Sequence, residues 1–179
     1  MKITSLPAVA VAVLAAMATS VPPALAEVAL AGQATLGGAT RQATLLLRCG
    51  VSSKGAIDGE LTVPSVDPLR RQYDFGSFEG PYAKSSKLPL STISSSGGSV
   101  TLTASGVIPI TPADGFRFGV MGKASDMARV MRPVATSGGI LTWTQANPVR
   151  GGAALKATFD VTASALPRVA AQLARCVGK

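Results

Sequence analysis

The sequence predicts a mainly β fold, an antiparallel sandwich or partly open barrel with a C-terminal α-helix packed on it. Three observations lead to this expectation. The chain has few aromatic residues (4%) and 19 glycines, a composition typical of short strands joined by many turns. Apolar and polar residues alternate in several segments, some of them directly after Gly-Gly turns. Near the C-terminus, apolar residues instead recur at helical spacing.

Residues 1–26 are expected to be a cleavable signal peptide, followed by a single β-rich domain over residues 27–179. Lys2 precedes the apolar run Val9–Met17, which is too short to cross a bilayer. Ala24-Leu25-Ala26 has the small-x-small pattern that a signal peptidase accepts, so Glu27 would begin the mature protein. The mature chain is expected to be periplasmic or secreted. It has no expected transmembrane segment, because Gly, Pro, Thr or Arg interrupts each apolar run.

The first two predicted strands form a hairpin. The apolar run Ala43–Cys49 ends at Gly50 and is typical of a strand buried on both faces. Ile57–Val63 alternates apolar and polar residues until Pro64 ends the pattern. Because a turn over Ser52–Gly55 separates the two runs, we expect them to pair.

An irregular segment, Pro64–Lys87, concentrates aromatic side chains in a chain that has few of them. We expect Tyr73, Phe75 and Phe78 to point inward as a small local core that pins a long loop. The alternative is an exposed recognition loop, because connecting segments often carry binding residues. The candidate recognition residues are Tyr73, Phe75, Phe78, Glu79 and Tyr82.

Further strands are predicted in the second half of the chain. Ser94–Thr103 and Ser137–Thr144 resemble each other, since each has a Gly-Gly turn followed by alternating apolar residues and threonines. Phe116–Met121 and Ala153–Val161 are also predicted to be strands.

Two helices complete the predicted elements. Ser125–Arg132 is expected to be a short helix that Pro133 stops. The last helix begins after Ser164, tolerates Pro167 in its first turn and places apolar residues at helical spacing up to Cys176.

Cys49 and Cys176 are the only cysteines, and we expect them to form a structural disulfide. A redox role would normally show a Cys-x-x-Cys pair. The bridge would fasten the last helix to the strand that ends at Cys49. It closes a long loop, for which the chain-entropy model gives about 5 kcal/mol of stabilisation.

The chain lacks the residues on which most hydrolases depend. It contains no histidine, the commonest general base and a frequent metal ligand. No lysine completes a Ser-x-x-Lys pair. Gly122-Lys123 does not complete a phosphate-binding loop, because Arg117 stands where the first glycine belongs.

Two carboxylate pairs remain as candidates for glycosidase chemistry, Asp58 with Glu60 and Asp74 with Glu79. The first pair is expected to lie on a solvated strand face. The second is expected to cap a turn or to meet an arginine. We therefore predict no enzymatic activity, and no catalytic, cofactor-binding or metal-binding residue.

The charge pattern favours an anionic partner. The net charge is +8, of which Lys2 contributes one. Lipid headgroups, lipopolysaccharide, wall polymers or an acidic protein would suit such a surface. Nucleic acid is not expected, because the basic residues are scattered and no stacking aromatics accompany them.

The strand end Leu45–Cys49, the closing strand Phe159–Val161 and the helix end Leu173–Cys176 resemble small exported accessory proteins of bacterial secretion systems. In those proteins a Leu-Arg-Cys strand pairs with a cysteine of a C-terminal helix. The resemblance implies no site residue. We expect an exported non-catalytic binding or accessory protein of the bacterial cell envelope, bound to an anionic envelope component or a protein. The alternatives are an inhibitor of an extracellular hydrolase that inserts the loop Phe75–Tyr82, and a pilin-like structural subunit.

Overall fold

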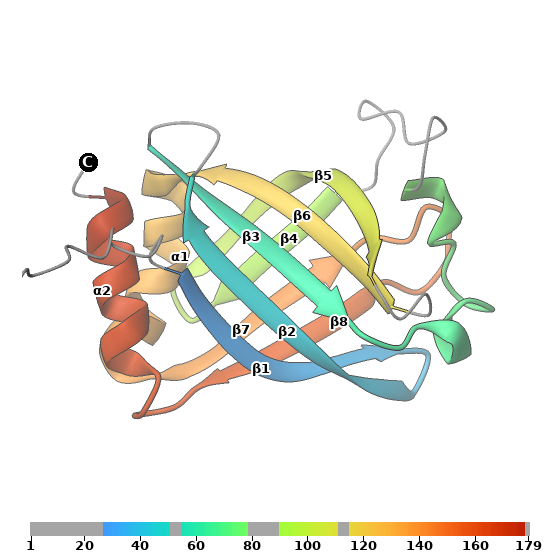
Figure 1. Cartoon of the computed structure of the whole chain (residues 1–179), viewed down its shortest axis with the longest axis horizontal. Coiled ribbons are helices and arrows are strands. Elements are labelled where there is room, and N and C mark those ends of the chain that lie inside the picture. The colour runs from blue at the N-terminus through green and yellow to red at the C-terminus, as the bar shows by residue number, and fades with distance from the viewer. Residues whose placement is uncertain (1–26, 51–54, 79–89, 111–114, 178–179) are drawn as a thin grey trace, which may run out of the picture.

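The computed structural model describes residues 27–50, 55–78, 90–110 and 115–177, so the expected signal peptide lies outside the described residues. Within these ranges, eight strands form a closed antiparallel barrel (Figure 1). The strands are β1 (Glu27–Leu36), β2 (Ala39–Cys49), β3 (Ala56–Val63), β4 (Leu90–Ser95), β5 (Gly98–Ile110), β6 (Gly115–Lys123), β7 (Gly139–Gln145) and β8 (Leu155–Val161). Their order around the barrel is β1-β2-β3-β6-β5-β4-β7-β8. The predicted mainly β fold is confirmed, and the barrel is closed.

Most of the predicted strands are present. β2 pairs with β3 as the expected hairpin, and β4 and β5 form a second hairpin around the turn at Ser96-Gly97. In β3, the alternation places Ile57, Gly59, Leu61 and Val63 on the buried face, as predicted.

The expectation that Ala43–Cys49 is buried on both faces is wrong. Within β2, Leu45 and Leu47 are fully buried, whereas Thr44 is exposed and Leu46 is half-buried. The wall of the barrel is a single sheet, so each strand has one face toward the core and one face outward.

Two strands, β1 and β4, are missing from the sequence prediction. β1 directs Val28, Leu30, Ala34 and Leu36 into the core. It turns into β2 at Gly37-Gly38, where both glycines have positive φ (53° and 85°). This alternation and the following Gly-Gly turn are the signals that would have located β1.

The interior of the barrel is the hydrophobic core. Its largest fully buried side chains are aromatic, and they come from the strands and from the segment between β3 and β4. Residues 64–78 of that segment include two short 3-10 helices, η1 (Asp67–Leu69) and η2 (Gly76–Phe78), and lie at one end of the barrel (Figure 1). We call this the loop end.

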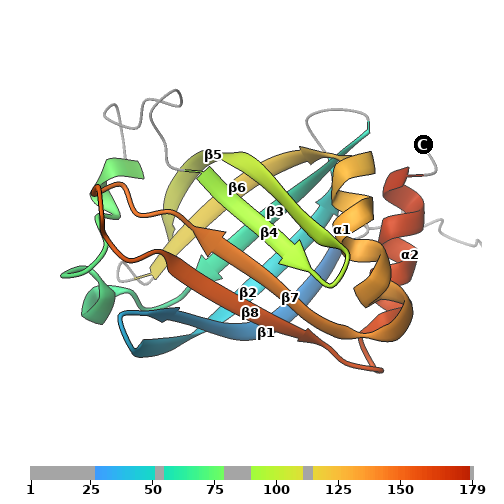
Figure 2. The ribbon, with the colours of Figure 1, turned by 180° about the vertical axis from the view of Figure 1, so that it is seen from behind.

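Two helices, α1 (Ala124–Ser137) and α2 (Leu166–Val177), close the opposite end of the barrel (Figure 2). They pack on each other and run in opposite directions, with α2 also in contact with β1 and β2. Pro167 lies in the first turn of α2, as expected. The last helix therefore packs on the barrel as predicted.

The expectation that Pro133 stops the first helix is wrong, because α1 continues through it to Ser137. Proline cannot donate a hydrogen bond to the carbonyl of Arg129 four residues earlier. The β4–β5 turn packs against this interruption. A Cβ added to Gly97 would lie 2.6 Å from the Arg129 carbonyl oxygen, and the hydroxyl of Ser95 donates to the carbonyl of Val130.

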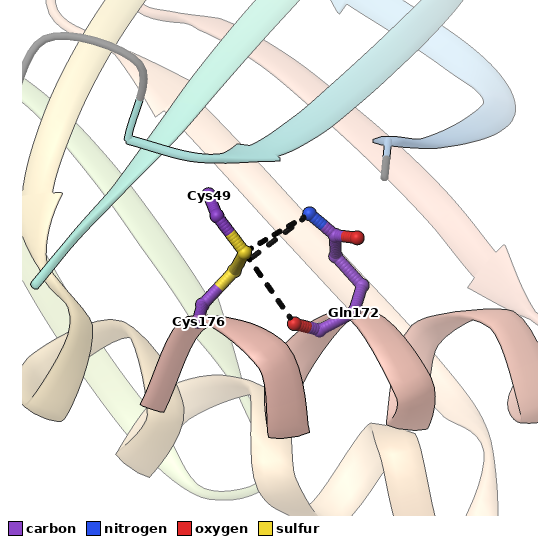
Figure 3. Close-up of a disulfide and its surroundings, with 3 residues drawn as sticks. All are labelled: Cys49, Gln172 and Cys176. Carbon is purple, nitrogen blue, oxygen red and sulfur yellow. Dashed lines mark hydrogen bonds between the residues drawn. A yellow bond between two sulfur atoms is a disulfide. The ribbon is translucent and has the colours of Figure 1, made fainter. Parts of the chain in front are cut away.

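The predicted disulfide between Cys49 and Cys176 is present (Figure 3). It joins the end of β2 to the last turn of α2 across 127 residues, with the two Cα atoms 4.9 Å apart. The buried side chain of Gln172, one turn earlier in α2, donates its amide N–H to the sulfur of Cys49 at 3.5 Å. The helix end of the barrel is thus covalently tied to its wall.

Candidate functional site

The loop end of the barrel is built from two segments that lie far apart in the sequence. Asn147 follows β7, and its side-chain amide donates to the carbonyl oxygens of Gln72 and Ala153, both at 2.9 Å. Its carbonyl oxygen accepts from the backbone N–H of Val149 at 3.0 Å. One side chain therefore shapes the loop 146–154 and joins it to the turn 69–73.

Tyr73 makes a second link between the same two segments. Its hydroxyl donates to the carbonyl oxygen of Ala146 at 2.8 Å, while its ring lies in the core and is 2% exposed. Burial raises the pKa of this phenol far above its ordinary value, because the charged form would lose its hydration. A hydrogen bond with Gln145 lowers the pKa, and the charge of Asp74 raises it further. Tyr73 therefore stays protonated and acts as a structural donor.

The aromatic residues singled out in the sequence form one buried cluster. The ring of Tyr73 contacts those of Phe75 and Phe78. All three pack, tilted or edge-on, against Phe116 and Phe118 of β6, with ring centroids 4.7 to 6.2 Å apart. These rings are buried, as the local-core interpretation predicts. Among the candidate recognition residues, Glu79 and Tyr82 lie outside the described residues.

A cleft of about 320 Å³ opens between the turn after η1 and the loop 146–154. Backbone and side chains of the turn form one wall, and residues of the loop form the other. Its lining comprises Arg70, Arg71, Gln72, Tyr73, Asp74, Phe75, Gly76, Val149 and Gly152. We call this feature the arginine cleft.

Three arginines, Arg70, Arg71 and Arg150, and two carboxylates, Asp67 and Asp74, lie in or beside the arginine cleft. The guanidinium of Arg70 lies 3.0 Å from the carboxylate of Asp67 and 5.9 Å from the ring centroid of Phe75. Asp74 accepts hydrogen bonds from the backbone N–H and the hydroxyl of Ser77. Arg71 and Arg150 are exposed, and in the described part of the chain neither forms an ion pair.

The sequence analysis does not predict this cleft, because Arg70-Arg71 is one adjacent pair among basic residues that are otherwise scattered along the chain. The available signal was their position directly before the aromatic cluster that closes the barrel. The opposite wall gave no such signal, since Val149 and Gly152 are unremarkable in the sequence.

Glu60, one of the two carboxylates of β3, forms ion pairs on the outside of the barrel. Glu60 lies 3.0 Å from the guanidinium of Arg48 on β2 and 3.2 Å from that of Arg117 on β6. Arg48 also lies 4.0 Å from Glu27. Glu60 therefore bridges three strands and is half-buried between the two arginines that flank it.

Comparison of the chain with models of protein families, with curated proteins and with solved structures found no match in any of the three. Across the described ranges, no three acidic or cysteine side chains come close enough together to hold a metal ion. No helix within those ranges has the length and apolar character needed to cross a membrane.

Proposed function

We propose that this protein is an exported, non-catalytic binding or accessory protein of the bacterial cell envelope that recognises an anionic partner through the arginine cleft. The observation that carries the proposal is the charge of the cleft. Arg71 lines the cleft, and Arg150 belongs to the loop 146–154 that forms the opposite wall. Together with Arg70 they outnumber the two nearby carboxylates, Asp67, which is paired with Arg70, and Asp74. A guanidinium suits a carboxylate or a phosphate, because it can donate two parallel hydrogen bonds to either group.

The architecture supports recognition through the surface. The barrel interior is occupied by the hydrophobic core, so a partner would bind outside it. Asn147 and Tyr73 hold the walls of the cleft together before any ligand arrives, which lowers the entropy lost on binding. The disulfide between Cys49 and Cys176 fits an oxidising compartment.

The closed barrel favours this proposal over a pilin-like subunit. Polymerisation by strand addition needs a sheet edge that can accept another strand. Each described strand here is hydrogen-bonded to a neighbour on both sides. The inhibitor alternative is also less favoured, because the rings of Phe75 and Phe78 fill the core and are not available to enter an enzyme cleft.

The proposal is tested by co-sedimentation of the purified, oxidised protein with anionic vesicles and with an anionic wall polymer, at low and at high salt. We expect binding at low salt that high salt abolishes. The double charge reversal Arg71→Glu and Arg150→Glu is expected to abolish binding to whichever of the two, vesicles or wall polymer, the wild-type protein binds.

The matched control is the double variant Arg168→Glu and Arg175→Glu, which makes the same change in net charge on exposed residues of α2 at the opposite end. It is expected to retain binding. Equal loss in both double variants would mean that net charge alone drives the association, and the arginine cleft would then have no specific role.

A further inference from the structure

A groove of about 330 Å³ runs between α1 and α2 on the surface at the helix end of the barrel. Its lining is mostly apolar and includes several small side chains. The lining residues are Arg132, Ala135, Thr136, Ala170, Leu173, Ala174 and Val177. The groove lies at the opposite end from the arginine cleft and shares no residue with it.

The shape of the groove suits an α-helix. Alanines at positions 135, 170 and 174 allow a partner backbone to approach the two helices closely, while Leu173 and Val177 supply an apolar floor. The side chain of Val177 is 43% exposed although it is apolar. An amphipathic helix with apolar residues at i, i+3, i+4 and i+7 would cover this surface.

The charge of the two helices selects the kind of partner helix. The two helices α1 and α2 together contain four arginines and one acidic residue, Asp126. Arg129 donates to the carbonyl oxygen of Ser99 at 3.1 Å and is thereby tied to the β4–β5 turn. Arg132, which lines the groove, is exposed and has no ion-pair partner among the described residues.

We infer that the groove between α1 and α2 docks an acidic amphipathic helix of a partner protein. The apolar stripe of that helix would pack on Leu173 and Val177, and carboxylates beside the stripe would pair with Arg132. A second copy of this chain fits less well, because two grooves facing each other would bring two Arg132 guanidinium groups together. The protein would then bind partners at both ends of the barrel.

The test uses a fluorescein-labelled helical peptide with leucines at i, i+4 and i+7 and glutamates on both sides of them. A peptide of the same composition with scrambled order serves as its control. We expect saturable binding of the first peptide in fluorescence anisotropy and at least tenfold weaker binding of the second. In NMR spectra of the protein, the backbone signals that shift should be those of Ala135, Ala170, Ala174 and Val177.

Two variants locate the contact. Arg132→Glu should weaken binding at least tenfold, and Ala174→Gln, which fills the groove with a neutral side chain, should do the same. Arg168→Glu is the matched control, because it reverses the charge of an exposed arginine on α2 that does not line the groove. We expect its binding to stay within twofold of wild type.

Several results would overturn the inference. These are absence of binding, equal losses for Arg132→Glu and Arg168→Glu, or NMR shifts confined to the loop end. Concentration-dependent dimerisation that Ala174→Gln abolishes would assign the groove to a second copy instead. The double variant Arg71→Glu and Arg150→Glu should leave peptide binding unchanged, so failure here is distinguishable from failure of the arginine cleft.

Discussion

At the scale of single residues, Asn147 determines the shape of the loop end. Its side chain satisfies two carbonyl oxygens and one backbone N–H that belong to segments on both sides of the arginine cleft. Replacing it with alanine leaves these groups without that partner. We expect Asn147→Ala to lower the free energy of unfolding by about 1 to 3 kcal/mol and to weaken anion binding at the cleft.

Urea unfolding and the co-sedimentation assay measure the two effects of Asn147→Ala. Thr144→Ala is a suitable control, since Thr144 lies on the outer face of β7 and its side chain is half-buried. If Asn147→Ala matched this control in both assays, the loop end would not depend on the amide for its shape.

Tyr73 is expected to make stability depend on alkaline pH. Burial raises the pKa of its phenol above the ordinary value of 10.0, so the folded protein keeps a proton that the unfolded chain releases. The contribution of Tyr73 is therefore fully present below pH 10. Above that pH, the free energy of unfolding should fall by about 1.4 kcal/mol per pH unit from this group.

The measurement is urea unfolding between pH 8 and pH 11 for the wild type and for Tyr73→Phe. The variant lacks the phenol and should lose that part of the alkaline decline, while lysines and the other tyrosine titrate equally in both proteins. Tyr73→Phe should also be about 1 kcal/mol less stable at neutral pH, because the hydrogen bond to Ala146 is lost. Parallel pH profiles would contradict the prediction.

In the candidate site, the sequence predicts the burial of individual side chains but not which distant loops come together to form the cleft. The inward orientation of Tyr73, Phe75 and Phe78 follows from their apolar rings and short spacing, so it was accessible from sequence. The arginine cleft was not, because Gln72 and Asn147 are 75 positions apart and meet only when the barrel closes. The alternation of apolar and polar residues indicates which face of a strand is buried. It does not indicate which loops lie next to each other in the fold.

At the scale of elements, the β4–β5 turn and α1 depend on each other. Gly97 faces the Arg129 carbonyl oxygen, and a Cβ at this position would lie 2.7 Å from the Pro133 ring. Neither the backbone oxygen nor the ring can move aside easily. We expect Gly97→Ala to lower the free energy of unfolding by about 1 to 3 kcal/mol, as overpacking in a fitted contact does.

The control for Gly97→Ala is Ser96→Ala in the same turn, whose exposed side chain should be replaceable within about 0.5 kcal/mol. Thermal and urea unfolding of both variants provide the comparison. A Gly97→Ala protein as stable as Ser96→Ala would show that the turn can separate from α1 without loss.

The elements that sequence reasoning found and missed differ in the strength of their pattern. β3, β6, β7 and β8 combine a clear alternation with β-branched or aromatic residues, and the structure contains all four. The outward face of β1 carries Ala29, Ala31 and Gln33, which have weak strand preference, so its sequence lacks the clear strand pattern of the other four. The prediction that α1 ends before Pro133 is wrong because it considers the helix alone. In the fold, the β4–β5 turn packs against α1 where proline interrupts its hydrogen bonds.

At the scale of the whole molecule, the barrel separates two basic surfaces. The arginine cleft lies at the loop end, and the groove between α1 and α2 lies at the other. The barrel between them is closed and packed with aromatic side chains, so it behaves as a rigid spacer. If both proposed contacts form, this rigid body would hold two partners at a fixed separation.

The disulfide distinguishes the two ends experimentally. Replacing both Cys49 and Cys176 with alanine removes a cross-link over 127 residues, which should lower the free energy of unfolding by about 4 to 5 kcal/mol. The remaining contacts of α2 are with α1 and with the ends of β1 and β2, so the helix should separate from the barrel more readily. The loop end has its own hydrogen bonds and does not contain the cysteines.

We therefore expect the double variant Cys49→Ala and Cys176→Ala to lose binding of the acidic helical peptide while it retains salt-sensitive anion binding. Both assays are run well below its unfolding midpoint, and mass spectrometry after alkylation first confirms that the wild-type cysteines are paired. Equal loss at both ends would mean that the molecule unfolds as a single unit without the bridge. Retention at both ends would show that the packing of α2 on α1 suffices to form the groove, and that the covalent tie contributes only to global stability.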